Sequence, residues 1–234
     1  LLFLGTFIGY FVSALLISGI IFPFLSKISG KKENNFSTNL TLGIKRYFRI
    51  SELRGLMFLN LAVSAGGSMI LVNTIILVRS SLELSEIAFA ITMLVFGAGC
   101  IFAAIIIPYL SKEMTESRIM LAGSNLLSVV FVALAFWLIL FDFIWFVLLL
   151  SWFISGFGYT LLLTPMGRVI RKVSSVDEFS QVYSAQFSLS HLCWLFMYPL
   201  SGYLMTISGG PFTLLTLAML VVCSNIIAAW HFRS

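Results

Sequence analysis

The segment that decides the fold runs from Ile119 to Pro165 and reads IMLAGSNLLSVVFVALAFWLILFDFIWFVLLLSWFISGFGYTLLLTP. Its 47 residues contain a single charged side chain, Asp142, which lies halfway along them. As one helix the segment would be roughly 70 Å long, about twice the thickness of a membrane core. A charge at the bilayer centre also costs on the order of 2.5–3.5 kcal/mol. We therefore predict a turn at Phe141–Asp142, with Trp137 and Trp145 in the interfacial aromatic belt beside it.

The whole chain has the composition of a membrane protein. Of its 234 residues, 60% are apolar and 10% are charged, and the mean hydropathy is +1.06. A soluble domain is roughly 45–50% apolar and about 25% charged, so a soluble enzyme, a disordered chain and a nucleic-acid binder are excluded. The net charge of +5 therefore reflects membrane topology. The cysteines are odd in number and lie in apolar stretches, which argues against a disulfide framework (Cys100, Cys193 and Cys223).

Apolar runs of the length that crosses a bilayer, about 20 residues, occur seven times along the chain. They are apolar on every face, whereas membrane strands alternate between apolar and polar residues. We predict an all-α fold, a polytopic membrane helical bundle with seven spans. The spans are Leu1–Phe24, Leu56–Val78, Ile87–Leu110, Ile119–Leu140, Phe143–Pro165, Val182–Ile207 and Phe212–Phe232.

The basic residues sort into alternate loops between these spans. One alternate set of loops and tail holds 13 of the 14 Lys and Arg residues, and the other set holds only Arg79. The positive-inside rule assigns the richer set to the cytoplasm, which places the N-terminus outside and the C-terminus in the cytoplasm. The last six spans divide into the triplets Leu56–Leu140 and Phe143–Phe232. Each triplet crosses an odd number of times, so we expect a 3+3 inverted repeat.

One polar segment, Ser26–Gly55, separates the first span from the other six. In its second half, apolar residues recur at helical spacing with cations between them (Leu40, Ile44, Tyr47 and Phe48). This pattern is typical of a short amphipathic helix on the cytoplasmic face near anionic lipid, and a solvated linker is the alternative. Ser51 is a candidate N-cap for the second span, with Glu52 in its first turn.

Several stretches now resemble a known family. They are SELRGLMFLNLAVSAGGSMILVNTIILVR (51–79), FGAGCIFAAIIIPYLSKEMTESRIMLAG (96–123), TPMGRVIRKVSSVDEFSQVYSAQFS (164–188) and YPLSGYLMTISGG (198–210). The chain resembles the C-terminal half of a major facilitator superfamily transporter, preceded by the last span of the N-terminal half. The family's acidic-basic loop signature is present only in part, without its usual aspartate (Ser111, Lys112, Glu113 and Arg118). The resemblance is closest in style to efflux members.

The resemblance implies a domain plan and a function. Residues 1–25 would be the last span of the N-terminal half, 26–55 the central cytoplasmic loop, and 56–234 the six-span C-terminal half. The expected function is a secondary transporter of the inner or plasma membrane, an efflux permease or antiporter that moves a small organic compound by alternating access. Its expected partners are that substrate, the lipid bilayer and the missing N-terminal half, with no nucleic acid. Because the chain begins at Leu1 within an apolar run, we expect it to be a piece of a longer protein.

A receptor or sensor with seven spans is the alternative, because it has the same topology. Against it, no lysine lies within the last span to hold retinal, and the long loop after the first span is not needed in a compact sensor. A membrane-embedded enzyme is a weaker option. The sequence has no phosphate-binding glycine loop, nucleophile set, paired catalytic carboxylates or metal-ligand cluster, so we predict no catalytic residue, no metal and no cofactor.

All 23 charged side chains fall in loops or at interfaces by this assignment. Intramembrane charges usually mark proton or ion pathways, so a carboxylate that couples transport to protons is expected in the missing half. His191, near the middle of the sixth span, is the one titratable exception. It is either a proton-linked group, since its ordinary pKa is near 6.5, or a neutral side chain hydrogen-bonded across helices.

Uncharged polar residues supply the candidate substrate surface. Asn60, Ser64 and Thr74 share one face of the second span, and Asn73 is adjacent. Tyr159 lies in the fifth span, and Gln186 and Trp194 lie two turns apart in the sixth. In the resemblance these helices face the central cavity, and we expect the second, third, fifth and sixth spans to line it. The alternative for all of them is helix–helix hydrogen bonding and packing.

Overall fold

The computed structural model describes residues 11, 12, 14–16, 18, 36–175 and 178–233, and these contain helices and no strand. Most of the first expected span, Leu1–Phe24, lies outside the described residues. The contacts divide the chain into two units, Leu1–Phe36 and Ser37–Ser234. The helices described below belong to the second unit, apart from Phe36 at the start of the first of them.

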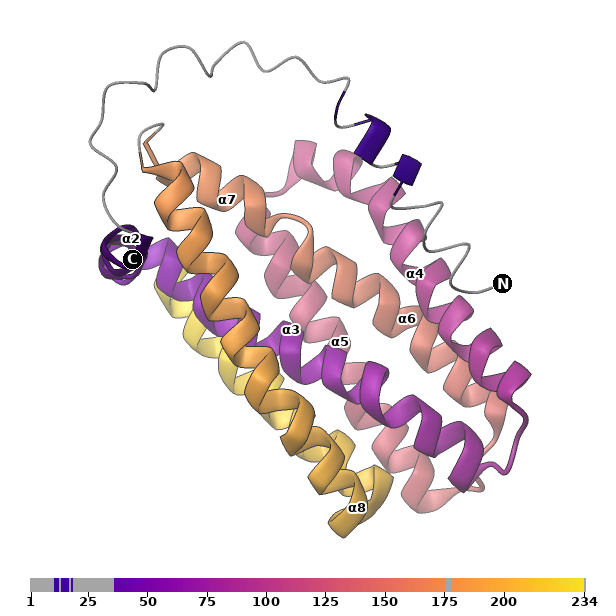
Figure 1. The fold of residues 1–234 in the computed structure, drawn as a ribbon. Helices are drawn as coiled ribbons and strands as arrows, with labels where there is room; N and C mark the ends of the chain where they lie inside the picture. Colours follow the sequence, from indigo (N-terminus) through magenta and orange to yellow (C-terminus); the bar gives the residue numbers. More distant parts are fainter. Residues whose placement is uncertain (1–10, 13, 17, 19–35, 176–177, 234) are drawn as a thin grey trace. The chain divides into compact units, whose positions relative to one another are not determined.

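The elements follow the chain in a simple order (Figure 1). They are α2 (Phe36–Tyr47), α3 (Ser51–Ile75) continued by the π-helical turn η2 (Ile76–Ser81), α4 (Glu86–Glu113), α5 (Glu116–Leu140), α6 (Trp145–Leu163), α7 (Met166–Val173) and α8 (Phe179–Arg233). Five of the described helical segments are long and apolar enough to cross a membrane: α3 with η2, α4, α5, α6 with α7, and α8. The predicted all-α, polytopic bundle is therefore confirmed.

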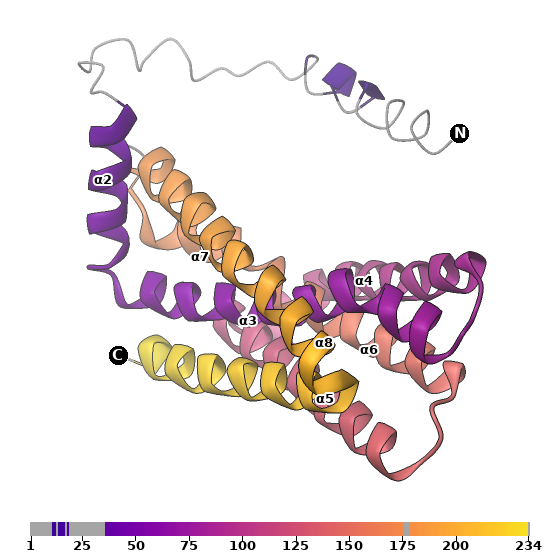
Figure 2. The ribbon, with the colours of Figure 1, turned by 60° about the horizontal axis from the view of Figure 1, so that its bottom comes forward.

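The last of these segments, α8, makes two crossings. Its 55 residues would span about 80 Å if straight, far more than a bilayer core. The helix breaks at Gly209, whose φ of 74° lies in the left-handed region that glycine adopts without strain. Beyond this break the second arm returns toward the start of the first, as Figures 1 and 2 show. The described unit thus has six crossings, and the two arms correspond to the expected spans Val182–Ile207 and Phe212–Phe232.

The turn predicted around Asp142 is present. α5 ends at Leu140 and α6 begins at Trp145, so the charged residue lies between the two helices. The indole Nε1 of Trp137 donates a hydrogen bond to the Asp142 carbonyl at 3.1 Å. Trp145 donates across to Thr92 of α4 at 2.9 Å. The two tryptophans that flank the turn therefore also hold its geometry.

The basic loops meet at one end of the bundle. One cavity of about 530 Å³ at this end is lined by basic residues from three helices and by Glu52 of α3. The basic residues are Arg118 in the first turn of α5, Lys172 of α7 and Arg233 at the end of α8. At the other end, the Gly209 break lies near η2 and the end of α5, because a Cβ on Gly210 would be 3.4 Å from Leu77 and 3.7 Å from Leu138. The charge alternation therefore corresponds to the two ends of the bundle, and which end faces the cytoplasm stays a prediction.

Glycines let the helices around α6 approach backbone to backbone. A Cβ on Gly99 of α4 would collide with the Phe153 carbonyl of α6, and one on Gly156 would collide with the Phe96 carbonyl of α4. On the other side, Gly123 of α5 faces Gly158 of α6. Close approach through small residues is the usual way in which helices associate where burial from water gives little driving force.

Two details of the sequence analysis are wrong. Ser51 does not cap α3: the N-cap is Ile50, and the Ser51 hydroxyl donates to the His231 carbonyl of α8 at 2.8 Å. The Ser51 hydroxyl is used in a tertiary hydrogen bond to α8, and it is not used to cap the first turn of α3. The segment around Arg168, expected to be a loop, forms the short helix α7, whose inner face, Met166, Val169 and Ile170, is buried.

The charge alternation predicts opposite accessibility for two single-cysteine variants made in a background without the native cysteines. Asp142→Cys and Lys172→Cys lie at opposite ends of the bundle, so a membrane-impermeant thiol reagent added to intact cells should label Asp142→Cys only. Labelling is read from the mass shift of the protein, with permeabilised cells as the control in which both react. Equal labelling in intact cells would contradict the assigned topology.

Candidate functional site

A cleft of about 420 Å³ opens between α3, α6, α7 and the first arm of α8. Five of the residues singled out from the sequence line it: Asn60, Tyr159, Gln186, His191 and Trp194. The lining also includes Tyr183 and Phe187, and it contains no Asp, Glu, Lys or Arg. The site therefore combines aromatic rings and uncharged polar groups with aliphatic side chains. α4 contributes nothing to this lining, contrary to the expectation for the third span, because it packs against α6.

The amide groups in the cleft belong to a chain of hydrogen bonds across three helices. The Tyr47 hydroxyl of α2 donates to Oε1 of Gln186 in α8. Gln186 in turn donates from Nε2 to Oδ1 of Asn60 in α3, at 2.9 Å. This order leaves the Nδ2 group of Asn60 buried with no hydrogen-bond partner in the described part of the chain. A buried donor without a partner costs free energy, so the site holds an unused donor beside the cleft.

Tyr47 is fully buried, and the sequence analysis did not include it among the candidate site residues. The pattern placed it on the lipid face of an amphipathic helix, but it points into the protein. Gly43, one turn earlier, explains this: it lets α2 approach so closely that a Cβ there would collide with the Gln181 carbonyl of α8. Burial, and to a smaller extent the nearby Cys193, raises the pKa of the Tyr47 phenol well above its usual value. The hydroxyl therefore remains protonated and available as the donor to Gln186.

Trp194 forms a wall of the cleft and is supported from behind. A Cβ on Gly67 of α3 would overlap the Trp194 ring, so glycine at this position makes room for the indole. The Tyr198 ring lies 4.9 Å from Trp194 between centroids. Across the cleft, Tyr159 of α6 packs on Phe96 at 5.9 Å. Aromatic rings held by such packing offer flat, preorganised surfaces for stacking.

His191 bonds within its own helix rather than across helices. Its Nδ1 lies 2.8 Å from the Phe187 carbonyl, and because a carbonyl only accepts, Nδ1 must carry the proton. The imidazole also packs on the Phe187 ring, with centroids 4.1 Å apart. The side chain is exposed and lines the cleft.

Three predicted site residues lie outside the cleft lining and make helix contacts. Ser64 donates to the Leu61 carbonyl in its own helix. Asn73 donates to Ser201 Oγ of α8 at 2.8 Å. Thr74 accepts from Trp152 Nε1 of α6 at 2.7 Å. All three are buried, and Asn73 and Thr74 tie α3 to its neighbours. A role for the three in substrate binding stays a prediction.

The geometry suits reversible binding. Among the residues that the structure describes, no group of three or more His, Cys, Asp and Glu side chains could hold a metal ion. The polar atoms that line the cleft are amides, hydroxyls and one imidazole. They can orient a ligand by hydrogen bonds while the rings stack on it.

A comparison with protein-family models matches residues 56–234 to the family described as Major Facilitator Superfamily. The match begins at the first residue of the expected second span and includes all six crossings of the described unit. No curated protein and no solved structure matches the chain.

Removing the Tyr47 hydroxyl should destabilise the protein without disturbing the fold. Tyr47→Phe keeps the buried ring but leaves the Gln186 acceptor unpaired, which costs about 1–3 kcal/mol. Tyr203→Phe, on an exposed ring of α8, is the matched control. In a thermal unfolding assay of the purified protein, Tyr47→Phe should lower the midpoint and Tyr203→Phe should not. Equal midpoints for both variants would mean that the hydrogen bond is not made.

Proposed function

Because the chain belongs to the major facilitator superfamily, and so is a multi-pass membrane protein of the secondary transporter type, we propose that it exports a small aromatic organic compound through the cleft. It would act as a transporter by alternating access and not as an enzyme. We place it in the cell membrane with its C-terminus in the cytoplasm, on the strength of the basic loops gathered at one end of the bundle.

The lining of the cleft is the observation that carries this proposal. Its volume falls within the range of about 300–1,000 Å³ that small-molecule sites occupy. Tyr159 and Trp194 provide faces on which an aromatic substrate stacks, and a substrate acceptor that displaces the packing over the buried Nδ2 group of Asn60 would gain one hydrogen bond from it. The absence of Asp, Glu, Lys and Arg from the lining favours a substrate without a permanent charge, since an ion would enter without a counter-ion.

Gln186 orients this donor. Since its Oε1 accepts from Tyr47 and its Nε2 donates to Asn60, the carbonyl of the Asn60 amide is already occupied. The Asn60 amide is therefore held with its carbonyl hydrogen-bonded and its NH₂ group without a partner. A substrate acceptor that reaches this NH₂ group would gain a hydrogen bond that the empty site lacks. This preorganisation supports selectivity for compounds with an acceptor beside an aromatic ring.

Alternating access requires this six-span part to rock against a second bundle. We propose that the second bundle is the N-terminal half, joined through the segment that contains α2. The charged residues of the described crossings lie at or near helix ends, which supports our assignment of the main coupling carboxylate to that half. We propose His191, the histidine of the cleft lining, as the group that links substrate binding to protons in this half.

Substitutions in the cleft should impair efflux more than they impair folding. In the full-length transporter, Asn60→Ala and Trp194→Ala should reduce export severalfold at unchanged membrane abundance, by losing the donor and the stacking wall. Asn225→Ala removes another buried asparagine, which bonds the Leu121 carbonyl away from the cleft, and is the matched control. Export is measured with a panel of fluorescent aromatic compounds in cells that lack the native gene. Parallel loss of export and abundance in the cleft variants would assign these residues a structural role.

If His191 takes part in proton coupling, its replacement should change how the export rate depends on pH, and not only the maximal export rate. His191→Gln keeps a polar side chain of similar reach but cannot gain or lose a proton in this pH range. We expect the export rate of the variant to be flat between about pH 5.5 and 7.5 where the wild-type rate varies. A variant whose rate keeps the wild-type shape over this range would remove the proton-linked role.

A further inference from the structure

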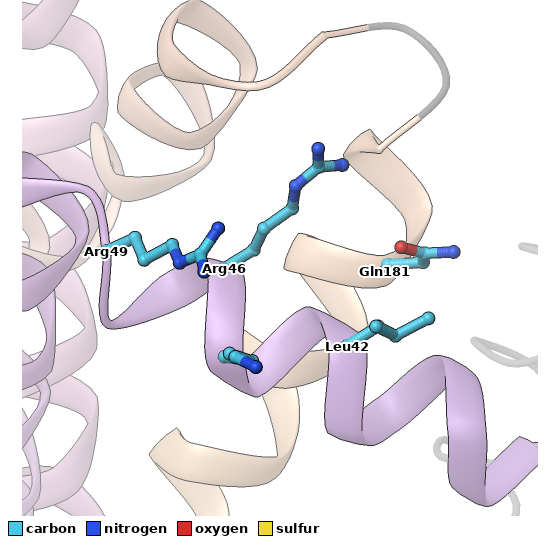
Figure 3. Close-up of a pocket in the computed structure, with 5 residues that line it drawn as sticks. Leu42, Arg46, Arg49 and Gln181 are labelled. Atoms are coloured by element: carbon cyan, nitrogen blue, oxygen red, sulfur yellow. The ribbon is translucent and has the colours of Figure 1, made fainter.

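A second site lies outside the cleft, in the groove between α2 and the beginning of α8. It has a volume of about 320 Å³ and is lined by Leu42, Lys45, Arg46, Arg49 and Gln181. Figure 3 shows the α2 side chains and Gln181 of α8 around this groove. We propose that the groove binds the phosphate headgroup of an anionic membrane lipid. This inference is independent of the transport substrate.

The position of α2 against α8, which forms the groove, is fixed by backbone and side-chain contacts. Gly43 brings the backbone of α2 against that of α8 at Gln181, and Tyr47, one turn later, is buried and bonded to Gln186. On the outer side, Arg46 forms an ion pair with Glu178, the residue just before α8. These contacts fix the inner face of α2, while Lys45 on α2 and Arg49 just after it are exposed.

The charge of the groove matches a phosphodiester. Three cations line it, and Glu178 neutralises one of them. Within the described residues, neither Lys45 nor Arg49 takes part in an ion pair, so about two positive charges remain for a ligand. The guanidinium of Arg49 presents a planar fork that binds two phosphate oxygens, and the Lys45 ammonium adds a point charge.

Apolar neighbours favour a lipid over a free anion. Leu42 in the groove lining and Phe48, just after α2, are large apolar side chains that remain 44% and 45% exposed. The groove also lies beside the start of the α3 crossing, since α3 begins at Ser51, only two residues after Arg49. α2 runs steeply across the direction of α3 (Figure 2), as a helix at a membrane surface does. A headgroup on Lys45 and Arg49 would therefore place its acyl chains along Leu42 and Phe48.

The test compares lipids on the purified full chain in phosphatidylcholine nanodiscs. A fluorescent phosphatidylglycerol analogue is titrated into the nanodiscs, and energy transfer from the protein tryptophans reports its binding. Lys45→Gln and Arg49→Gln should each weaken binding about fivefold, the expected effect of one basic residue near an anionic surface. Lys172→Gln and Arg171→Gln, on α7 at the same end of the bundle, are matched controls that should change it little.

Each other outcome overturns the proposal. If the α7 variants weaken binding as much as the α2 variants, the attraction is a diffuse surface charge and not a site. If a phosphatidylcholine analogue binds as tightly, the negative charge is not recognised. If millimolar inorganic phosphate displaces the lipid analogue completely, the groove is a free-anion site. Thermal unfolding of each variant verifies that a loss of binding does not come from a loss of folding.

Discussion

Hydrocarbon offers no hydrogen-bond partner to a peptide group, and this constraint determines the rest of the structure. Every crossing must satisfy its own backbone, so the described crossings are helices and the non-helical breaks fall between them. Asp142 and Gly209 mark two such places: one supplies a charge that cannot stay at the bilayer centre, and the other a backbone conformation that other residues adopt only with strain. The helices then have to associate without water driving them together, which is why glycines recur where backbones touch.

The same constraint explains the chemistry of the polar groups in the bundle. Charges lie toward the ends, and the polar contacts between crossings are made by amides, hydroxyls and indoles. Some of these contacts lie outside the cleft lining, as between Asn73 and Ser201, and join helices. The contact among Tyr47, Gln186 and Asn60 is incomplete, because one amide donor is left over beside an open cleft. Asn73 also leaves one amide atom, Oδ1, without a partner, but only Asn60 lines the cleft, so position separates the two clusters.

Local pattern and charge were enough to predict the crossings, but not the tertiary partners of single residues. Residue counts and the single charge at Asp142 predict the α5–α6 turn, because span length is a property of the chain alone. Ser51 was misassigned because a cap rule considers only the next turn of chain, and the carbonyl of His231 is 180 residues away. Tyr47 was missed because amphipathic spacing cannot distinguish a face against lipid from one against protein. Asn60 and Asn73 share a helix, and the sequence does not encode which of them faces an opening.

The single-residue hinge within α8 has a practical consequence for engineering. The arm that carries Gln186 and Trp194 is joined to the next crossing through Gly209, with no intervening loop. An epitope or reporter inserted there would have to unwind one arm or the other, and it would disturb the cleft from the far end of the bundle. At that same end of the bundle, the segment between Leu140 and Trp145 is non-helical, so an insertion there need not unwind a helix. It is the better place for a tag intended to report on the protein without altering it.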